Sequence, residues 1–190
     1  LGLDPTHHAR ALRRQIGVVM QENALDGVMN VRDNMLMFCG YHNIRGQEAQ
    51  RTVDELLDFM ALTEKATAKI QHLSGGMQRR LAFVRSLIAK PKLLILDEPT
   101  TGLDPAVRQL LWEKVLEIKR QGTTVILTTH YMDEAELLCD RLVLLNHGAL
   151  QAEGSPKALI ERFCPGYVSF FAESTAAQDV YTRFYTSDLE

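Results

Sequence analysis

Two adjacent carboxylates, Asp97 and Glu98, follow the aliphatic run 93–96 and stand directly before Pro99. The aliphatic residues predict a strand buried on both faces, as in a parallel sheet, and Pro99 ends its pairing. Open α/β sheets bind ligands at the carboxyl ends of such strands, where two charges are costly unless a metal or a reacting group uses them. The pair therefore indicates phosphoryl transfer, with Mg²⁺ held by Asp97 through water and the attacking water oriented or deprotonated by Glu98. Two solvated acids at a strand end are the alternative, and this stretch alone does not decide.

Five motifs stand in a fixed order around and within this strand. They are Gln21 after the apolar run 16–20; Leu73, Ser74, Gly75, Gly76, Met77 and Gln78 at the start of a helical stretch; 93–97 with Glu98; 102–104, ending in Asp104; and His130 after two threonines. This set resembles the nucleotide-binding subunit of ABC transporters, where these motifs are the Q-loop, the signature, the Walker B strand with the catalytic glutamate, the D-loop and the switch histidine. The resemblance covers residues from about 13 to about 159. The sequence of residues 129–136 and 139–141 is most similar to that of ABC-2 type exporters, including daunorubicin-resistance and nodulation-factor export ATPases.

The resemblance implies catalytic roles for Glu98 and His130, with His130 contacting the γ-phosphate and stabilising the charge that develops there. It also implies that Gln21 and Asp97 hold Mg²⁺ through water, and that Gln21 leads into the segment touching the membrane subunit. The implied ligands are ATP and Mg²⁺. A structural histidine at a strand end is the ordinary alternative for His130.

The signature residues 73–78 and Asp104 are implied to bind nucleotide across a head-to-tail dimer. Ser74 opens a helix whose N-terminus favours negative charge, and the two glycines after it let the backbone approach a phosphate. Each position also has a structural alternative. Ser74 can be an ordinary helix cap, and Asp104 can cap the helix that Pro105 begins.

The 190 residues contain no phosphate loop of the form G-x-x-x-x-G-K-[ST], since no glycine is followed by lysine. That loop cradles the β- and γ-phosphates. Residues 1–5 resemble the stretch after the phosphate-loop helix, so we expect a fragment of an ATP-hydrolysing subunit that is inactive alone. In related ATPases the phosphate-loop strand lies between strands matching 123–128 and 142–145, and we expect both to have an unpaired edge.

The expected fold is α/β, an incomplete RecA-like P-loop NTPase core with an inserted helical subdomain at about residues 28–85. Strands are expected at 15–21, 93–97, 123–128, 142–145 and 150–153, and helices at 31–42, 47–62, 74–87, 105–120, 133–139 and 156–162. Residues 1–163 form the partial ABC ATPase domain. Residues 164–190 form an extension with a strand at 167–172 and a helix at 176–185, the start of an accessory domain.

The composition of the chain excludes some classes of binding partner. A net charge of −3 argues against a nucleic-acid-binding module, and three cysteines without a C-x-x-C pair suit a reducing compartment. No apolar run approaches the roughly 18 residues that span a bilayer. The expected partners are a transmembrane permease subunit and a second ATP-binding subunit, with no nucleic acid, at the cytoplasmic face of the cell membrane.

Two other functions stay open at this point. One is a non-transport ABC ATPase in DNA repair or translation, although the segment between Gln21 and Ser74 has no heptad run of the kind that forms the coiled coils of the repair enzymes. The other is a non-catalytic interaction module that has lost ATP binding.

Overall fold

The computed structural model describes residues 1–163, 166–171 and 180–186. Contacts divide the chain into two compact units, Leu1–His130 and Tyr131–Glu190. The predicted boundary between residues 163 and 164 stays a prediction, as do the predicted bounds of the helical subdomain. Within the described residues, no helix combines the length and the apolarity needed to cross a bilayer.

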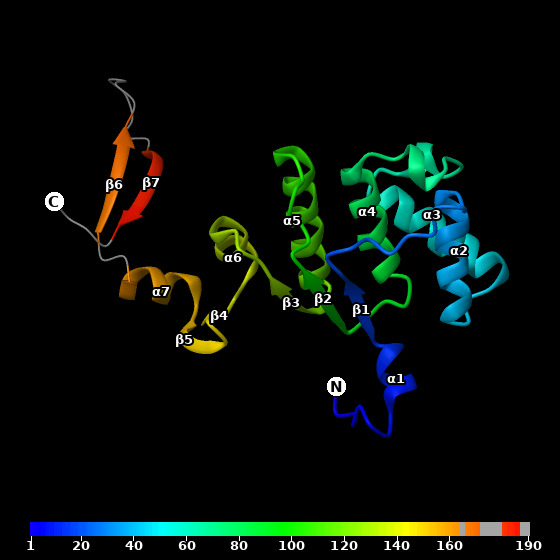
Figure 1. The fold of residues 1–190 in the computed structure, drawn as a ribbon, viewed down its shortest axis with the longest axis horizontal. Helices are drawn as coiled ribbons and strands as arrows, with labels where there is room; N and C mark the ends of the chain where they lie inside the picture. Colours follow the sequence, from blue (N-terminus) through cyan, green and yellow to red (C-terminus); the bar gives the residue numbers. More distant parts are fainter. Residues whose placement is uncertain (164–165, 172–179, 187–190) are drawn as a thin grey trace. The chain divides into compact units, whose positions relative to one another are not determined.

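The first unit is built on a parallel sheet with the strand order β1-β2-β3 (Figure 1). These strands are β1 (Ile16–Val19), β2 (Leu93–Asp97) and β3 (Thr124–Thr128). Leu94 and Leu96 of the central strand are fully buried, whereas Leu93 and Ile95 on its other face are half-buried. The parallel pairing that the aliphatic run predicts is confirmed, but complete burial holds for one face only.

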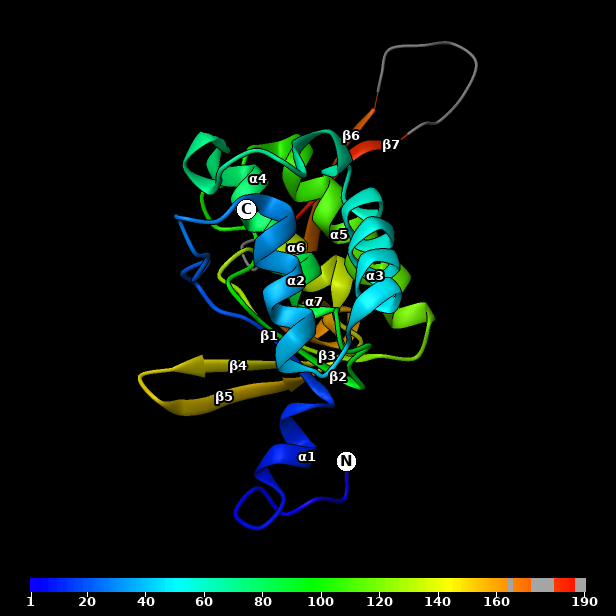
Figure 2. The same cartoon turned by 90° about the vertical axis from the view of Figure 1, so that its right-hand side faces the viewer.

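Helices fill the sequence between these strands (Figure 1). They are α2 (Val31–Tyr41), α3 (Gly46–Phe59), the 3₁₀ turns η1 (Thr63–Lys65) and η2 (Ile70–His72), α4 (Gly75–Ser86) and α5 (Pro105–Arg120). Asn30 caps α2 by accepting a hydrogen bond from the Asp33 N–H, as its residue type predicts. Figure 2 shows α2 beside α3, and both contact α4 around a core that includes Met35, Leu57 and Phe83.

A short helix, α1 (Ala9–Arg13), precedes β1 and was not expected from the sequence. None of its residues is buried, and it carries Arg10 and Arg13 on the surface. This helix buries little apolar surface, so the hydrophobic effect contributes little to holding it in place.

The second unit starts with α6 (Met132–Leu138), followed by the antiparallel hairpin of β4 (Leu142–Asn146) and β5 (Ala149–Gly154). Its turn is formed by His147 and Gly148, both with positive φ, as the expected hairpin requires. The helix α7 (Pro156–Phe163) follows, and Ser155 caps it by accepting a hydrogen bond from the Ala158 N–H. Leu159 of α7 packs on β5, where it lies close to Gly154.

The last described elements are an antiparallel pair, β6 (Gly166–Phe171) and β7 (Val180–Thr186). The strand predicted at 167–172 is confirmed for 167–171. The helix predicted at 176–185 is wrong for 180–185, and residues 176–179 lie outside the described residues. The segment 180–186 is rich in β-branched and aromatic residues, which favour a pleated strand when a partner strand is available.

The expected unpaired edges are found. Among the described residues, β3 pairs with β2 only and β4 pairs with β5 only. Apolar side chains remain accessible on both strands, with Ile126 at 50%, Val143 at 53% and Leu145 at 70% exposure. An open strand edge with exposed apolar side chains is a template for pairing with another chain.

We expect the 190-residue chain to self-associate through β3, and Ile126→Lys to shift it towards monomer because a charge on an edge strand opposes pairing. Val28→Lys is the control, since Val28 is 87% exposed but lies outside the strands. Sedimentation velocity over a concentration series measures both. Equal self-association of the two variants would assign the contact to another surface.

Candidate functional site

The carboxyl end of β2 is tied to the end of β3 through Thr128. The Glu98 N–H donates to the Thr128 carbonyl oxygen at 3.0 Å and to Thr128 Oγ1 at 3.2 Å. Thr128 Oγ1 in turn donates to Asp97 Oδ1 at 2.5 Å. Glu98 has a φ of +44°, which costs a non-glycine residue roughly 1–3 kcal/mol. The contacts with Thr128 hold this conformation and orient the Asp97 carboxylate.

The two predicted catalytic residues lie next to each other. Glu98 Oε1 is 3.5 Å from His130 Nδ1, and Glu98 Oε2 accepts a hydrogen bond from Thr101 Oγ1 at 3.1 Å. The Glu98 side chain is 32% exposed and that of His130 is 53% exposed, so both are accessible to a substrate. Each carboxylate oxygen of Glu98 therefore has a polar neighbour that fixes its direction.

The structural alternatives for Ser74 and Asp104 are both observed. Ser74 Oγ accepts from the Met77 N–H at 3.3 Å and caps α4, and Asp104 Oδ1 accepts from the Val107 N–H at 3.0 Å and caps α5. Both capping residues are exposed. Capping and ligand binding are compatible here, because a capped helix still presents its N-terminus to solvent.

The other signature residues shape the start of α4. Leu73 is buried, and Gln78 Nε2 donates to the Ile70 and Leu73 carbonyl oxygens at 3.3 Å each. A Cβ on Gly76 would lie 3.4 Å from a methyl group of Val107, so the start of α4 faces the start of α5 at ordinary contact distance. Leu73 and Gln78 thus hold the loop, and Gly75 lies exposed at its tip.

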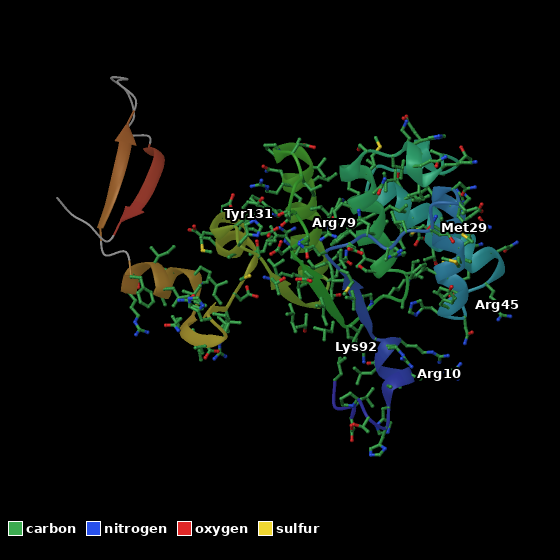
Figure 3. The ribbon with its side chains drawn as sticks, viewed as in Figure 1. Arg10, Met29, Arg45, Arg79, Lys92 and Tyr131 are labelled. Carbon is green, nitrogen blue, oxygen red and sulfur yellow. The ribbon has the colours of Figure 1, made fainter. Side chains whose placement is uncertain are left out.

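Arg79 is a residue of the site that sequence reasoning missed. It lies in α4 and is only 5% exposed, and Figure 3 places it near the ends of β1 and β2. Its guanidinium donates to the carbonyl oxygens of Met20, Gln21, Asp97, Glu98 and Pro99 and to Asn23 Oδ1. Arg80 and Arg85 stand in the same helix, so the sequence does not distinguish Arg79 from its neighbours.

These contacts bring Gln21 beside Asp97 and Glu98. A cavity of about 270 Å³ is lined by Gln21, Gly75, Arg79, Glu98 and Gly102 among others. Residues from four of the predicted motifs, which are far apart in the sequence, therefore face one cavity. Ser74, Asp104 and His130 do not line it.

The residues present fit a Mg²⁺ ion that reaches the protein through water and substrate. Asp97 Oδ1 is held by Thr128, while Oδ2 accepts no hydrogen bond from the residues that the structure describes. The described part of the chain holds no group of three or more His, Cys, Asp or Glu residues able to bind a metal. Such a donor set suits Mg²⁺, which typically uses one or two carboxylates together with substrate phosphates and water.

Comparison with known families decides the assignment of the chain. Residues 2–101 match the family described as ABC transporter. The chain belongs to the ABC transporter family. The predicted family resemblance and the predicted P-loop NTPase fold class are thereby confirmed.

Curated relatives of this ABC family chain are export proteins. The Nod factor export ATP-binding protein I of Rhizobium sp. (strain N33) is 50% identical over 153 residues, which cover 80% of this chain and 50% of that protein. The protein of the same name from Rhizobium meliloti (strain 1021) is 48% identical over 161 residues, covering 85% of this chain and 48% of that protein. The chain spans about half the length of the curated relatives that it matches.

Solved structures of the family share the fold. The cbiO1 protein of Clostridium perfringens, part of the ABC transporter complex cbiONQ, has a TM-score of 0.70 and 30% identity, covering 80% of this chain and 61% of that one. An ATP-binding cassette solved as a dimer in a post-hydrolysis state with ADP and Pi has a TM-score of 0.71 and 26% identity, covering 82% and 68%. An ATP-binding subunit of an ABC transporter has a TM-score of 0.75 and 26% identity, covering 85% and 68%.

Proposed function

We propose that the full-length protein is the ATP-binding and ATP-hydrolysing subunit of an ABC-type export system. The observation that supports this best is the arrangement of Glu98 and His130 at the ends of neighbouring parallel strands, 3.5 Å apart, with Asp97 oriented beside them. The proposed ligands are ATP and Mg²⁺. The proposed partners are a transmembrane permease subunit and a second ATP-binding subunit, on the cytoplasmic face of the cell membrane. The similarity to Nod factor export proteins supports export over DNA repair or translation.

In this proposal Glu98 orients the attacking water and accepts its proton on a carboxylate oxygen. Thr101 and His130 fix the direction of that carboxylate, so little reorganisation is needed when the proton moves. His130 also stabilises the negative charge that grows on the transferred phosphoryl group. When bound with nucleotide, Mg²⁺ neutralises charge on the phosphate oxygens, and Asp97 and Gln21 would hold it through water.

Ser74, Gly75 and Asp104 are proposed to act on the nucleotide of a second subunit in a head-to-tail dimer. The exposed N-terminus of α4 offers backbone N–H groups and a partial positive charge to an anionic group. A large side chain at Ser74 would block that approach.

A matched pair of serines tests this role in the full-length protein. We expect Ser74→Arg to lower ATP turnover roughly tenfold or more, because the phosphate loses its access to the helix N-terminus. Ser155→Arg removes an equivalent cap from α7, which costs about 1 kcal/mol in either variant. We expect Ser155→Arg to keep nearly the full turnover.

Turnover is measured by phosphate release, and ATP-dependent dimerisation by size-exclusion chromatography. A similar loss of turnover in both variants would attribute the effect to helix stability and remove the signature role from Ser74.

A further inference from the structure

Arg79 is the point where the segment after β1 meets the segment after β2. Its Nη1 donates to the carbonyl oxygens of Met20 and Gln21 at 2.5 and 3.1 Å. Its Nη2 donates to those of Asp97 and Glu98 at 2.9 Å each. These oxygens belong to the last residue of β2 or to residues just beyond the two strands, where strand pairing supplies few donors.

The fork geometry of arginine explains why one side chain serves both segments. Nη1 and Nη2 point in different directions within one rigid plane. Nε donates in a third direction, to the Pro99 carbonyl oxygen at 2.8 Å. A lysine ammonium at the same place has three donors on a single atom and cannot span both groups of acceptors. Because Arg79 is 5% exposed, water does not replace these donors easily.

We propose that Arg79 is a positioning residue that fixes the spacing between the Gln21 segment and the Glu98 turn, so that both face the same cavity. It touches neither substrate nor reacting atoms in this role, and it acts through the backbone that carries Gln21 and Glu98. The kinetic consequence rests on the proposed function, whereas the structural consequence does not.

The same helix provides a matched control in Arg85. Its Nη1 donates to the Ala24 carbonyl oxygen at 2.6 Å and its Nη2 to that of Asn23 at 2.9 Å. Its guanidinium also lies over the ring of Phe38 at 4.3 Å. Arg85 therefore anchors the segment after Gln21 to α4 without reaching the end of β2.

The test compares Arg79→Met and Arg85→Met by hydrogen–deuterium exchange in the full-length protein. We expect Arg79→Met to speed amide exchange about tenfold in two places, residues 17–19 at the end of β1 and residues 98–103 after β2, where amide N–H groups are hydrogen-bonded. Arg85→Met should speed exchange only at residues 26–28, just after the segment that Arg85 anchors. If Arg79→Met loosens one segment alone, or the whole chain uniformly, the positioning role is overturned.

Arg79→Lys serves if the methionine variant does not fold, since it keeps the charge and the aliphatic stem. We expect protection to be lost at one of the two segments, and wild-type protection at both would overturn the proposal.

In ATPase assays, Arg79→Met should lower kcat roughly tenfold with little change in KM, and Arg85→Met should change neither much. An unchanged kcat beside loosened segments would overturn the kinetic part. A wild-type protein without ATPase activity would reject the proposed function, while the exchange pattern would still decide the role of Arg79.

Discussion

We expect Glu98→Gln in the full-length protein to lower ATP turnover by a factor of roughly 10²–10⁴ while ATP binding persists. The amide keeps the shape of the side chain, and its oxygen can still accept the hydrogen bond from Thr101. It cannot accept the proton of the attacking water, so the loss falls on kcat. Steady-state phosphate release measures turnover, and calorimetric titration with ATP measures binding.

Glu117→Gln is the matched control for this substitution. Glu117 lies in α5, is 42% exposed and contacts Lys114 at 3.2 Å, which resembles the half-exposed setting of Glu98 without its neighbours. We expect its turnover to stay close to that of the wild type, because surface ion pairs contribute little. His130→Ala should also lower turnover strongly. A wild-type kcat in Glu98→Gln would show that another group takes the proton.

The nearness of Glu98 and His130 could be predicted because it follows from strand order. Glu98 comes directly after an aliphatic run, and His130 comes shortly after a run rich in β-branched residues. Parallel neighbouring strands place their carboxyl ends at one edge of the sheet. The caps at Ser74 and Asp104 were predictable for a different reason. Capping is a local interaction across three residues, so residue type and position carry most of the information.

Arg79 and Thr128 could not be assigned in the same way. Arg79 bonds to backbone carbonyl oxygens that are about 20 and nearly 60 residues away, and backbone acceptors leave no pattern in the sequence. Thr128 fits equally well as an ordinary β-branched strand residue, and its contact with Asp97 exists only once β2 and β3 are in register. Strand pairing in the folded chain also explains why the helix predicted at 180–185 is wrong. Pairing with β6 there outweighs a weak helical pattern.

Gly17 is the residue whose substitution should cost the first unit most stability. It lies in β1 opposite the end of α4, and a Cβ there would lie 2.4 Å from the Ser86 carbonyl oxygen. The side chains of Leu94 and Pro91 would lie 3.0 and 3.1 Å away. Because the nearest atom belongs to the backbone, α4 has to move as a whole to relieve the clash. We expect Gly17→Ala to lower the free energy of unfolding by about 3 kcal/mol.

Gly40→Ala provides the comparison for the same chemical change. Gly40 lies in α2 and is exposed, and a Cβ added there would meet no atom within 4 Å. Alanine favours the helix there, and we expect a gain of about 0.5 kcal/mol. Urea unfolding followed by far-UV circular dichroism gives both values. If Gly17→Ala unfolds at the wild-type midpoint, α4 can shift away from β1 at little cost, and the close approach of these two elements does not contribute to stability.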